Sequence, residues 1–192
     1  FIYLRWLAVF GQSGAVIAGF FFLNLDLKLE LISFLILLSA SINIVATLLY
    51  PENKRLSEKD IFLLLMYDLV QLSILLLLTG GLTNPFSVLV LAPVTISATA
   101  LRLGSTLILG AIATVLITIL GFLYIPLTTT NNASLDPEIL LVGTWLALLI
   151  TVIFLAGYAR RVTVEMSSMS EALLATQMAL EREQRLTALG GV

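Results

Sequence analysis

Six long apolar runs, separated by short polar segments, organise the sequence. A helix needs about 20 mainly apolar residues to cross the hydrocarbon core of a bilayer. The pattern therefore predicts an all-α membrane protein with six transmembrane helices, near residues 2–23, 31–50, 61–78, 86–101, 103–125 and 139–158. We group residues 1–158 as a six-span sensor domain and residues 159–192 as a cytoplasmic signalling helix.

The third and fourth runs meet at a short glycine turn. Gly80 and Gly81 can adopt positive φ and end the preceding helix, and the side chain of Asn84 can cap the next one. Pro85 then fits the first helical position, where its missing N–H costs nothing. These features alone predict a tight helix–turn–helix at a membrane face, with or without a ligand.

The fourth run is too short to cross a bilayer core as a regular helix. Its 16 residues would span about 24 Å, and Pro93 interrupts them near the middle. We expect Thr95, Ser97 or Thr99 to help satisfy the carbonyl that Pro93 frees. A short, kinked helix after a glycine turn indicates a lipid-accessible hollow between the third and fourth spans.

Polar residues inside the third run form a second candidate site. Asp68 and Gln71 lie on one helical face, which Leu75 and Thr79 continue toward Gly80. A carboxylate within a membrane helix is costly unless it is paired, protonated or facing a cavity, so Asp68 is a functional candidate. The alternative is a hydrogen bond across the bundle to Asn43 or Gln12. We expect interhelical hydrogen bonds from a further group of polar residues, namely Gln12, Ser13, Asn43 and Thr151.

Basic residues fall on one side of the membrane if the N-terminus is cytoplasmic. Lys28 alone is then outside, and an even number of spans returns the C-terminus to the cytoplasm. The basic residues assigned to the cytoplasm are Arg5, Lys54, Arg55, Lys59, Arg102, Arg160 and Arg161. Residues 51–60 mix both charge signs and are expected to form a solvated loop.

The sequence after Arg161 is polar and helix-forming. Apolar side chains recur in alternating steps of four and three, which predicts a parallel dimeric coiled coil through residues 162–189. The positions of this seam are Val162, Met166, Met169, Leu173, Thr176 and Leu180, with Glu183 following. A single amphipathic helix on the membrane surface is the alternative, although its polar face is not rich in Lys or Arg.

Composition supports the membrane assignment and limits the chemistry. Hydrophobic residues make up 59% of the 192 residues and charged residues 11%, far from the proportions of soluble domains. The chain has no cysteine and no histidine. Disulfides, thiolate metal sites and imidazole chemistry are therefore excluded within it, and we predict neither a catalytic residue nor a metal site.

The turn resembles a motif of a known family. The stretch from Gly80 to Phe86 matches the GGxxNPF heptapeptide of the RegB/PrrB/ActS-type redox-responsive sensor histidine kinases. The segment from Arg185 to Gly190 is similar to the helix that leads into their phosphoacceptor histidine box. The resemblance covers nearly the whole chain.

This resemblance implies a bacterial inner-membrane protein that senses redox state through ubiquinone. It implies a quinone site formed by Gly80, Gly81, Thr83, Asn84, Pro85 and Phe86, with Asp68 and Gln71 as nearby polar partners. It also implies a homodimer in contact with membrane lipid, without a nucleic-acid partner. The chain has none of the family's phosphoacceptor, its ATP- and Mg-binding domain that phosphorylates a response regulator, or its redox cysteine. We expect these parts either to lie beyond Val192 or to be missing.

Two other functions fit the residues. The chain could be a small transporter or channel subunit that uses Asp68 as a proton or cation site. It could also be a membrane scaffold whose coiled-coil stalk recruits a partner.

Overall fold

The computed structural model describes residues 2–49, 56–130 and 135–190, and its regular structure there is helical. The elements in chain order are α1 (Ile2–Phe21), α2 (Leu29–Leu49), α3 (Glu58–Leu78), η1 (Gly81–Thr83), η2 (Pro85–Val90), α4 (Leu91–Ala100), α5 (Leu103–Phe122) and α6 (Pro137–Gly190), where η marks 3₁₀ helices. Outside the helices, one isolated antiparallel bridge joins Leu25 to Thr129. The predicted all-α class is confirmed.

The predicted membrane spans correspond to these helices. Five helices are long and apolar enough to cross a membrane, and a sixth apolar segment, residues 85–100, is shorter. The short fourth span was expected from the sequence. The expected loop at residues 51–60 ends at Ser57, because Ser57 and Asp60 form a capping box that starts α3 three residues earlier than predicted. Lys54 and Arg55 lie outside the described residues.

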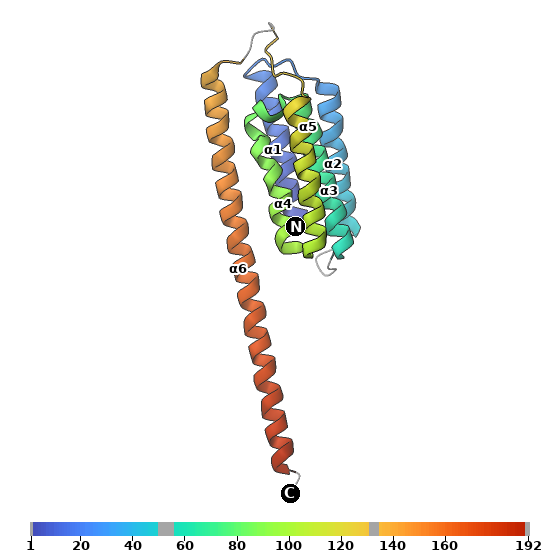
Figure 1. Cartoon of the computed structure of the whole chain (residues 1–192), viewed down its shortest axis with the longest axis vertical. Coiled ribbons are helices and arrows are strands. Elements are labelled where there is room, and N and C mark those ends of the chain that lie inside the picture. Colours follow the sequence, from blue (N-terminus) through green and yellow to red (C-terminus); the bar gives the residue numbers. More distant parts are fainter. Residues whose placement is uncertain (1, 50–55, 131–134, 191–192) are drawn as a thin grey trace. The chain divides into compact units, whose positions relative to one another are not determined.

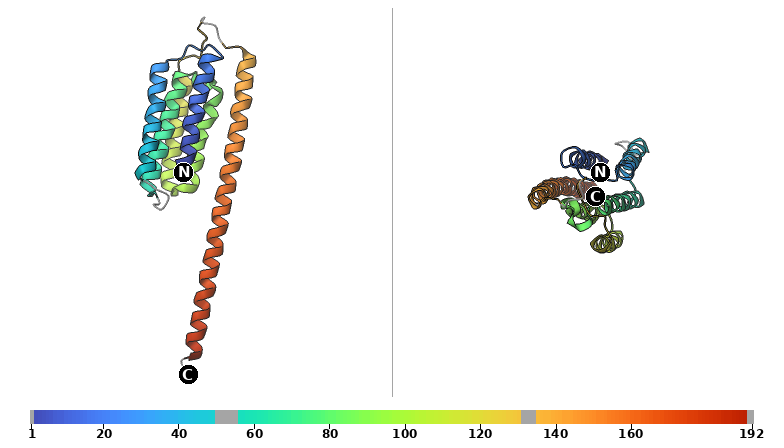
Figure 2. Two further views of the ribbon diagram at one scale, coloured as in Figure 1. Left: turned by 180° about the vertical axis from the view of Figure 1, so that it is seen from behind. Right: turned by 90° about the horizontal axis from the view of Figure 1, so that it is seen from above.

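Residues up to Thr151 form one compact unit, and residues from Val152 form another. In the first unit, α1 to α5 run side by side (Figures 1 and 2). α1 packs on α2, α2 packs on α3, and α3, α4 and α5 pack on one another. α3 is thus the helix with the most neighbours, and its buried side chains include Leu65 and Leu69.

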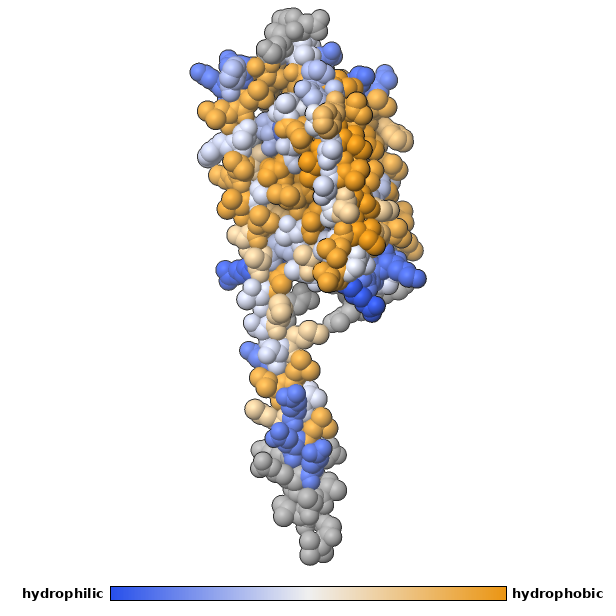
Figure 3. Space-filling model, viewed as in Figure 1, coloured by the Kyte–Doolittle hydropathy of each residue, from blue (hydrophilic) through white to orange (hydrophobic). Residues whose placement is uncertain are grey.

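The outer face of this bundle is apolar. Figure 3 shows hydrophobic residues along the length of the bundle, with hydrophilic residues gathered at its two ends. Large side chains such as Phe10, Phe34 and Leu107 are exposed on it. A surface of this kind suits contact with lipid tails rather than water.

One polar contact joins the start of α3 to the start of α5. The carboxylate of Glu58 accepts hydrogen bonds from the backbone N–H of Arg102 at 3.1 Å and from the Ser105 hydroxyl at 2.9 Å, and it pairs with the Arg102 side chain at 3.1 Å. The N-cap of α5 is Arg102, whose side chain makes no capping hydrogen bond. Glu58 therefore caps α5 from a neighbouring helix.

We expect Glu58→Ala to lower the midpoint of thermal unfolding in detergent by a few degrees, because the first turn of α5 loses its cap. Glu30→Ala is the matched control, since Glu30 is an exposed carboxylate in the first turn of α2. Equal midpoints for the two variants would contradict the capping role.

Candidate functional site

The predicted turn has the expected backbone conformation. α3 ends at Leu78, and Gly80 and Gly81 follow with φ values of 105° and 58°. A left-handed conformation costs glycine little and other residues considerably more. The end of the helix is thus set by the two glycines that the sequence pattern identified.

The turn lies directly against the segment that follows α5. A Cβ atom placed on Gly81 would be 2.6 Å from Cβ of Tyr124 and 2.8 Å from the carbonyl oxygen of Leu120. The backbone N–H of Ile125 also donates to the carbonyl of Leu77 at 2.8 Å. Gly81 is therefore needed for this close approach as well as for its φ.

Asn84 holds the turn together with its side chain. Its Oδ1 accepts from the backbone N–H of Phe86 at 2.9 Å, which confirms the predicted cap. Its Nδ2 donates to the carbonyl oxygen of Thr79 at 2.7 Å and to the Thr79 hydroxyl at 2.9 Å. The Thr83 hydroxyl donates to the carbonyl of Gly80 at 2.6 Å. A ligand bound by the side chains of Asn84 or Thr83 would have to replace these bonds.

The segment after the turn differs from the expected kinked α-helix. Pro85 starts the 3₁₀ helix η2, and the α-helical part, α4, begins only at Leu91. Pro93 therefore lies in the first turn of α4, where its missing N–H breaks no α-helical bond. Thr95, Ser97 and Thr99 donate to the carbonyls of Leu91, Val94 and Ile96, so the expected rescue of a carbonyl freed by Pro93 was wrong.

The turn also lies close to the first turns of α6. A Cβ atom placed on Gly143 would be 3.0 Å from Cγ of Pro85. In the turn, Gly80 and Gly81 are buried, while the Phe86 side chain is half-buried and Leu82 is exposed. The polar Thr83 is exposed as well, so both apolar and polar side chains of the turn are accessible.

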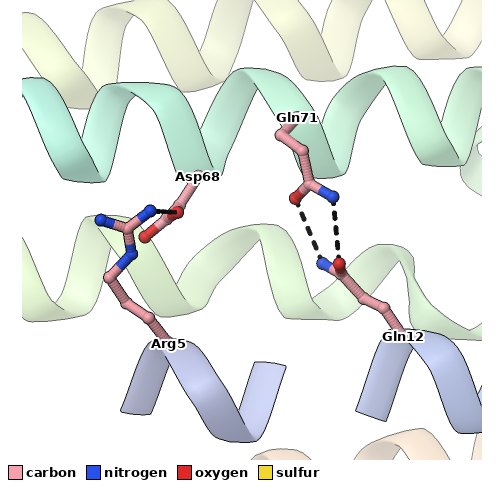
Figure 4. Close-up of polar contacts among 4 residues, drawn as sticks. All are labelled: Arg5, Gln12, Asp68 and Gln71. Atoms are coloured by element: carbon pink, nitrogen blue, oxygen red, sulfur yellow. Dashed lines mark hydrogen bonds and ion pairs between the residues drawn. The ribbon is translucent and has the colours of Figure 1, made fainter. Parts of the chain in front are cut away.

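Asp68 and Gln71 face α1 rather than the turn (Figure 4). Oδ1 of Asp68 lies 2.9 Å from Nη2 of Arg5. The side-chain amides of Gln71 and Gln12 bond reciprocally, at 3.0 and 3.3 Å. Asp68 therefore does not bond to Asn43 or Gln12, the two partners considered from the sequence. A transported cation at Asp68 would have to displace Arg5.

Arg5 is the residue that sequence reasoning missed. We assigned it to the cytoplasmic side of the membrane without a partner, and only 4% of its surface is exposed. α1 and α3 run in the same direction, since one antiparallel helix separates them. Arg5 and Gln12 are seven residues apart on α1, whereas Asp68 and Gln71 are three apart on α3. The long arginine side chain covers the difference, which is about 6 Å of helix. The sequence signal that could have predicted this ion pair is the presence of opposite charges, Arg5 and Asp68, on two helices that run in the same direction.

The remaining polar predictions have mixed outcomes. Gln12 makes the expected interhelical bond, whereas the Ser13 and Thr151 hydroxyls donate to carbonyls of their own helices. Asn43 is fully buried, and neither polar atom of its side chain has a hydrogen-bond partner. In the described ranges, no group of acidic residues is arranged to hold a metal ion.

We expect Gly81→Ala to cost at least about 2 kcal/mol of stability, because the new methyl group meets Tyr124 and the backbone must stay left-handed. Gly110→Ala in α5 is the control: a Cβ atom there meets nothing within 4 Å, so we expect no loss. Thermal unfolding in detergent checks both variants. A Gly81→Ala protein as stable as Gly110→Ala would contradict the packing described.

Comparison with known proteins gives a family. The family described as "PilS-like transmembrane domain" matches residues 21–174. Two relatives from Cereibacter sphaeroides, both named Sensor histidine kinase RegB, are each 50% identical over all 192 residues of the chain, which spans 42% of their length. No solved structure matches. With its apolar helices, the chain is a multi-pass protein of the bacterial inner membrane. It belongs to the PilS-like transmembrane domain family.

Proposed function

We propose that the chain is the membrane sensor region of a sensor histidine kinase that responds to the redox state of membrane quinone. The observation that carries this proposal is the 50% identity to Sensor histidine kinase RegB along every residue of the chain. In the full-length protein, a kinase core would use ATP and Mg to phosphorylate its own histidine and then a response regulator. Both ends of the chain would be cytoplasmic, as the distribution of basic residues predicts.

The turn from Gly80 to Phe86 is the proposed quinone site. A quinone head group has a flat apolar ring and two carbonyl acceptors, so it needs an apolar surface with few donors. The half-buried Phe86 and the exposed Leu82 could supply the apolar surface. Because Asn84 and Thr83 already bond within the turn, we assign them to its shape and assign ring contact to Phe86.

The surroundings of the turn suggest how binding could be transmitted. The turn contacts Tyr124 after α5, and Pro85 approaches Gly143 in α6. α6 continues as one helix to Gly190, through the predicted signalling segment. A ligand that binds one arrangement of the turn more tightly than another would favour that arrangement, and with it one arrangement of α6. The free energy of this shift cannot exceed the difference in the ligand's binding free energy for the two arrangements.

A homodimer through residues 162–189 completes the proposal. Four apolar side chains of the α6 seam are each more than half exposed in the single chain, namely Met166, Met169, Leu173 and Leu180. A second copy, packed in parallel, would cover this stripe. The polar Thr176 on the seam would keep the coiled coil only moderately stable, which suits a helix pair that changes its packing.

We expect Phe86→Ala to raise the Kd for a short-chain ubiquinone about tenfold, because the ring contact is lost while the Asn84 cap uses only backbone atoms of residue 86. Equilibrium binding to the chain in nanodiscs measures this change. Phe21→Ala is the matched control, since Phe21 is an exposed phenylalanine at the end of α1. Equal binding by both variants and wild type would remove the proposed site.

We expect Leu173→Glu to weaken dimerisation at least tenfold, because it places two like charges on an apolar seam. Leu174→Glu makes the same change at the next residue, which is also exposed but lies off the seam, and should dimerise normally. Sedimentation equilibrium in detergent measures the two dissociation constants. Similar values would favour a single surface helix over a coiled coil.

A further inference from the structure

The contact between α1 and α3 depends on side chains. The backbone of α1 packs on α2, and that of α3 packs on α2, α4 and α5. Arg5–Asp68 and Gln12–Gln71 bridge α1 and α3 with long polar side chains (Figure 4). Such a contact can open without separating tightly packed backbones.

The Arg5 guanidinium is only partly satisfied where it lies. Nη2 pairs with Asp68, but Nε and Nη1 are buried without a hydrogen-bond partner. Asn43, which is fully buried on α2, has none for its side-chain amide either. A buried arginine is tolerated only while its counter-charge is present, so this cluster depends on the charge of Asp68.

Few other groups act on this pair. Arg5 is the charged group that acts on Asp68. The ring of Tyr67, also on α3, lies 6.0 Å from Cζ of Arg5, and its hydroxyl is near Ser39 of α2 without hydrogen-bond geometry. Among the described residues, α2, α4 and α5 bring no charged side chain to it. The acidic residues at the start of α3 have other partners: Glu58 bonds to Arg102 and Ser105, and Asp60 bonds to Ser57.

The Arg5 side chain can also reach a second, solvated position. It is the fourth residue of α1, which begins at Ile2, so its long side chain can extend along the helix to the polar membrane face. Asp68, by contrast, lies midway along the 21 residues of α3. If Asp68 took up a proton, the buried position of Arg5 would lose its counter-charge and the outer position would be favoured.

We propose that Asp68 is a proton-binding site that controls whether α1 stays attached to α3. With Asp68 ionised, Arg5 lies inside and the two helices are held together. With Asp68 protonated, Arg5 moves to the membrane face and α1 shifts relative to α3. This site is separate from the quinone turn, so the proposal can be tested without any bound quinone.

Spin-label distances between α1 and α3 test the proposal. The chain has no cysteine, so labels on Phe10→Cys and Leu63→Cys, both exposed positions, are specific. The full chain in quinone-free nanodiscs is titrated from about pH 8 to about pH 4, across the carboxylate range. We expect the distance to lengthen reversibly on acidification, by about one helical turn or roughly 5 Å. A wild-type distance that does not change over this range overturns the proposal, whatever the variants do.

Three variants separate the proton site from general acid effects. Asp68→Asn should show the long distance at every pH, and a short distance like that of wild type overturns the proposal. The double variant Arg5→Gln, Asp68→Asn removes both charges and should stay short throughout; lengthening in acid would identify general unfolding instead. Asp26→Asn changes an exposed carboxylate in the α1–α2 connection and should titrate like wild type. Loss of its acid response would place the proton at Asp26.

Discussion

A polar group between these helices has no water to bond, and this constraint governs the structure. Each such group must find a partner within the chain or cost several kcal/mol. Ser13, Ser73 and Thr151 donate to carbonyls of their own helices. Gln12 and Gln71 form reciprocal hydrogen bonds, and the carboxylate of Asp68 forms an ion pair with Arg5. Among the described residues, the exceptions are the side-chain amide of Asn43, guanidinium nitrogens of Arg5 and the Tyr67 hydroxyl, which are buried without a hydrogen-bond partner.

The same constraint explains the form of the glycine turn. Reversing the chain leaves the last carbonyls of α3 and the first N–H groups of η2 without helical partners. Asn84 serves both sets, since its Nδ2 donates to the carbonyl of Thr79 and its Oδ1 accepts from the N–H of Phe86. The glycines let the backbone turn sharply enough to bring these groups within reach of one side chain. Asparagine is suited to this position because its amide both donates and accepts.

The sequence was most informative where local chemistry decides the structure. The apolar runs, the positive φ of Gly80 and Gly81 and the cap by Asn84 depend on nearby residues, and all were predicted. The burial of Arg5 and its ion pair were not predicted, because counting basic residues assumes that each one lies in water, whereas its partner on α3 is 63 residues away. Likewise, Pro93 predicts a break only if it lies in the interior of a helix, and α4 instead begins at Leu91, two residues before it.

α3 links the two sites that we propose. The turn follows its last residue, and Asp68 lies twelve residues before Gly80, about 18 Å along the helix axis. No side chain spans that distance, so direct contact cannot couple the two sites. A helix is stiff along its axis, however, and α3 also packs on α2, α4 and α5. A displacement of α3 at one proposed site would also displace the other, and ligand and proton would then change each other's binding affinity by the same factor.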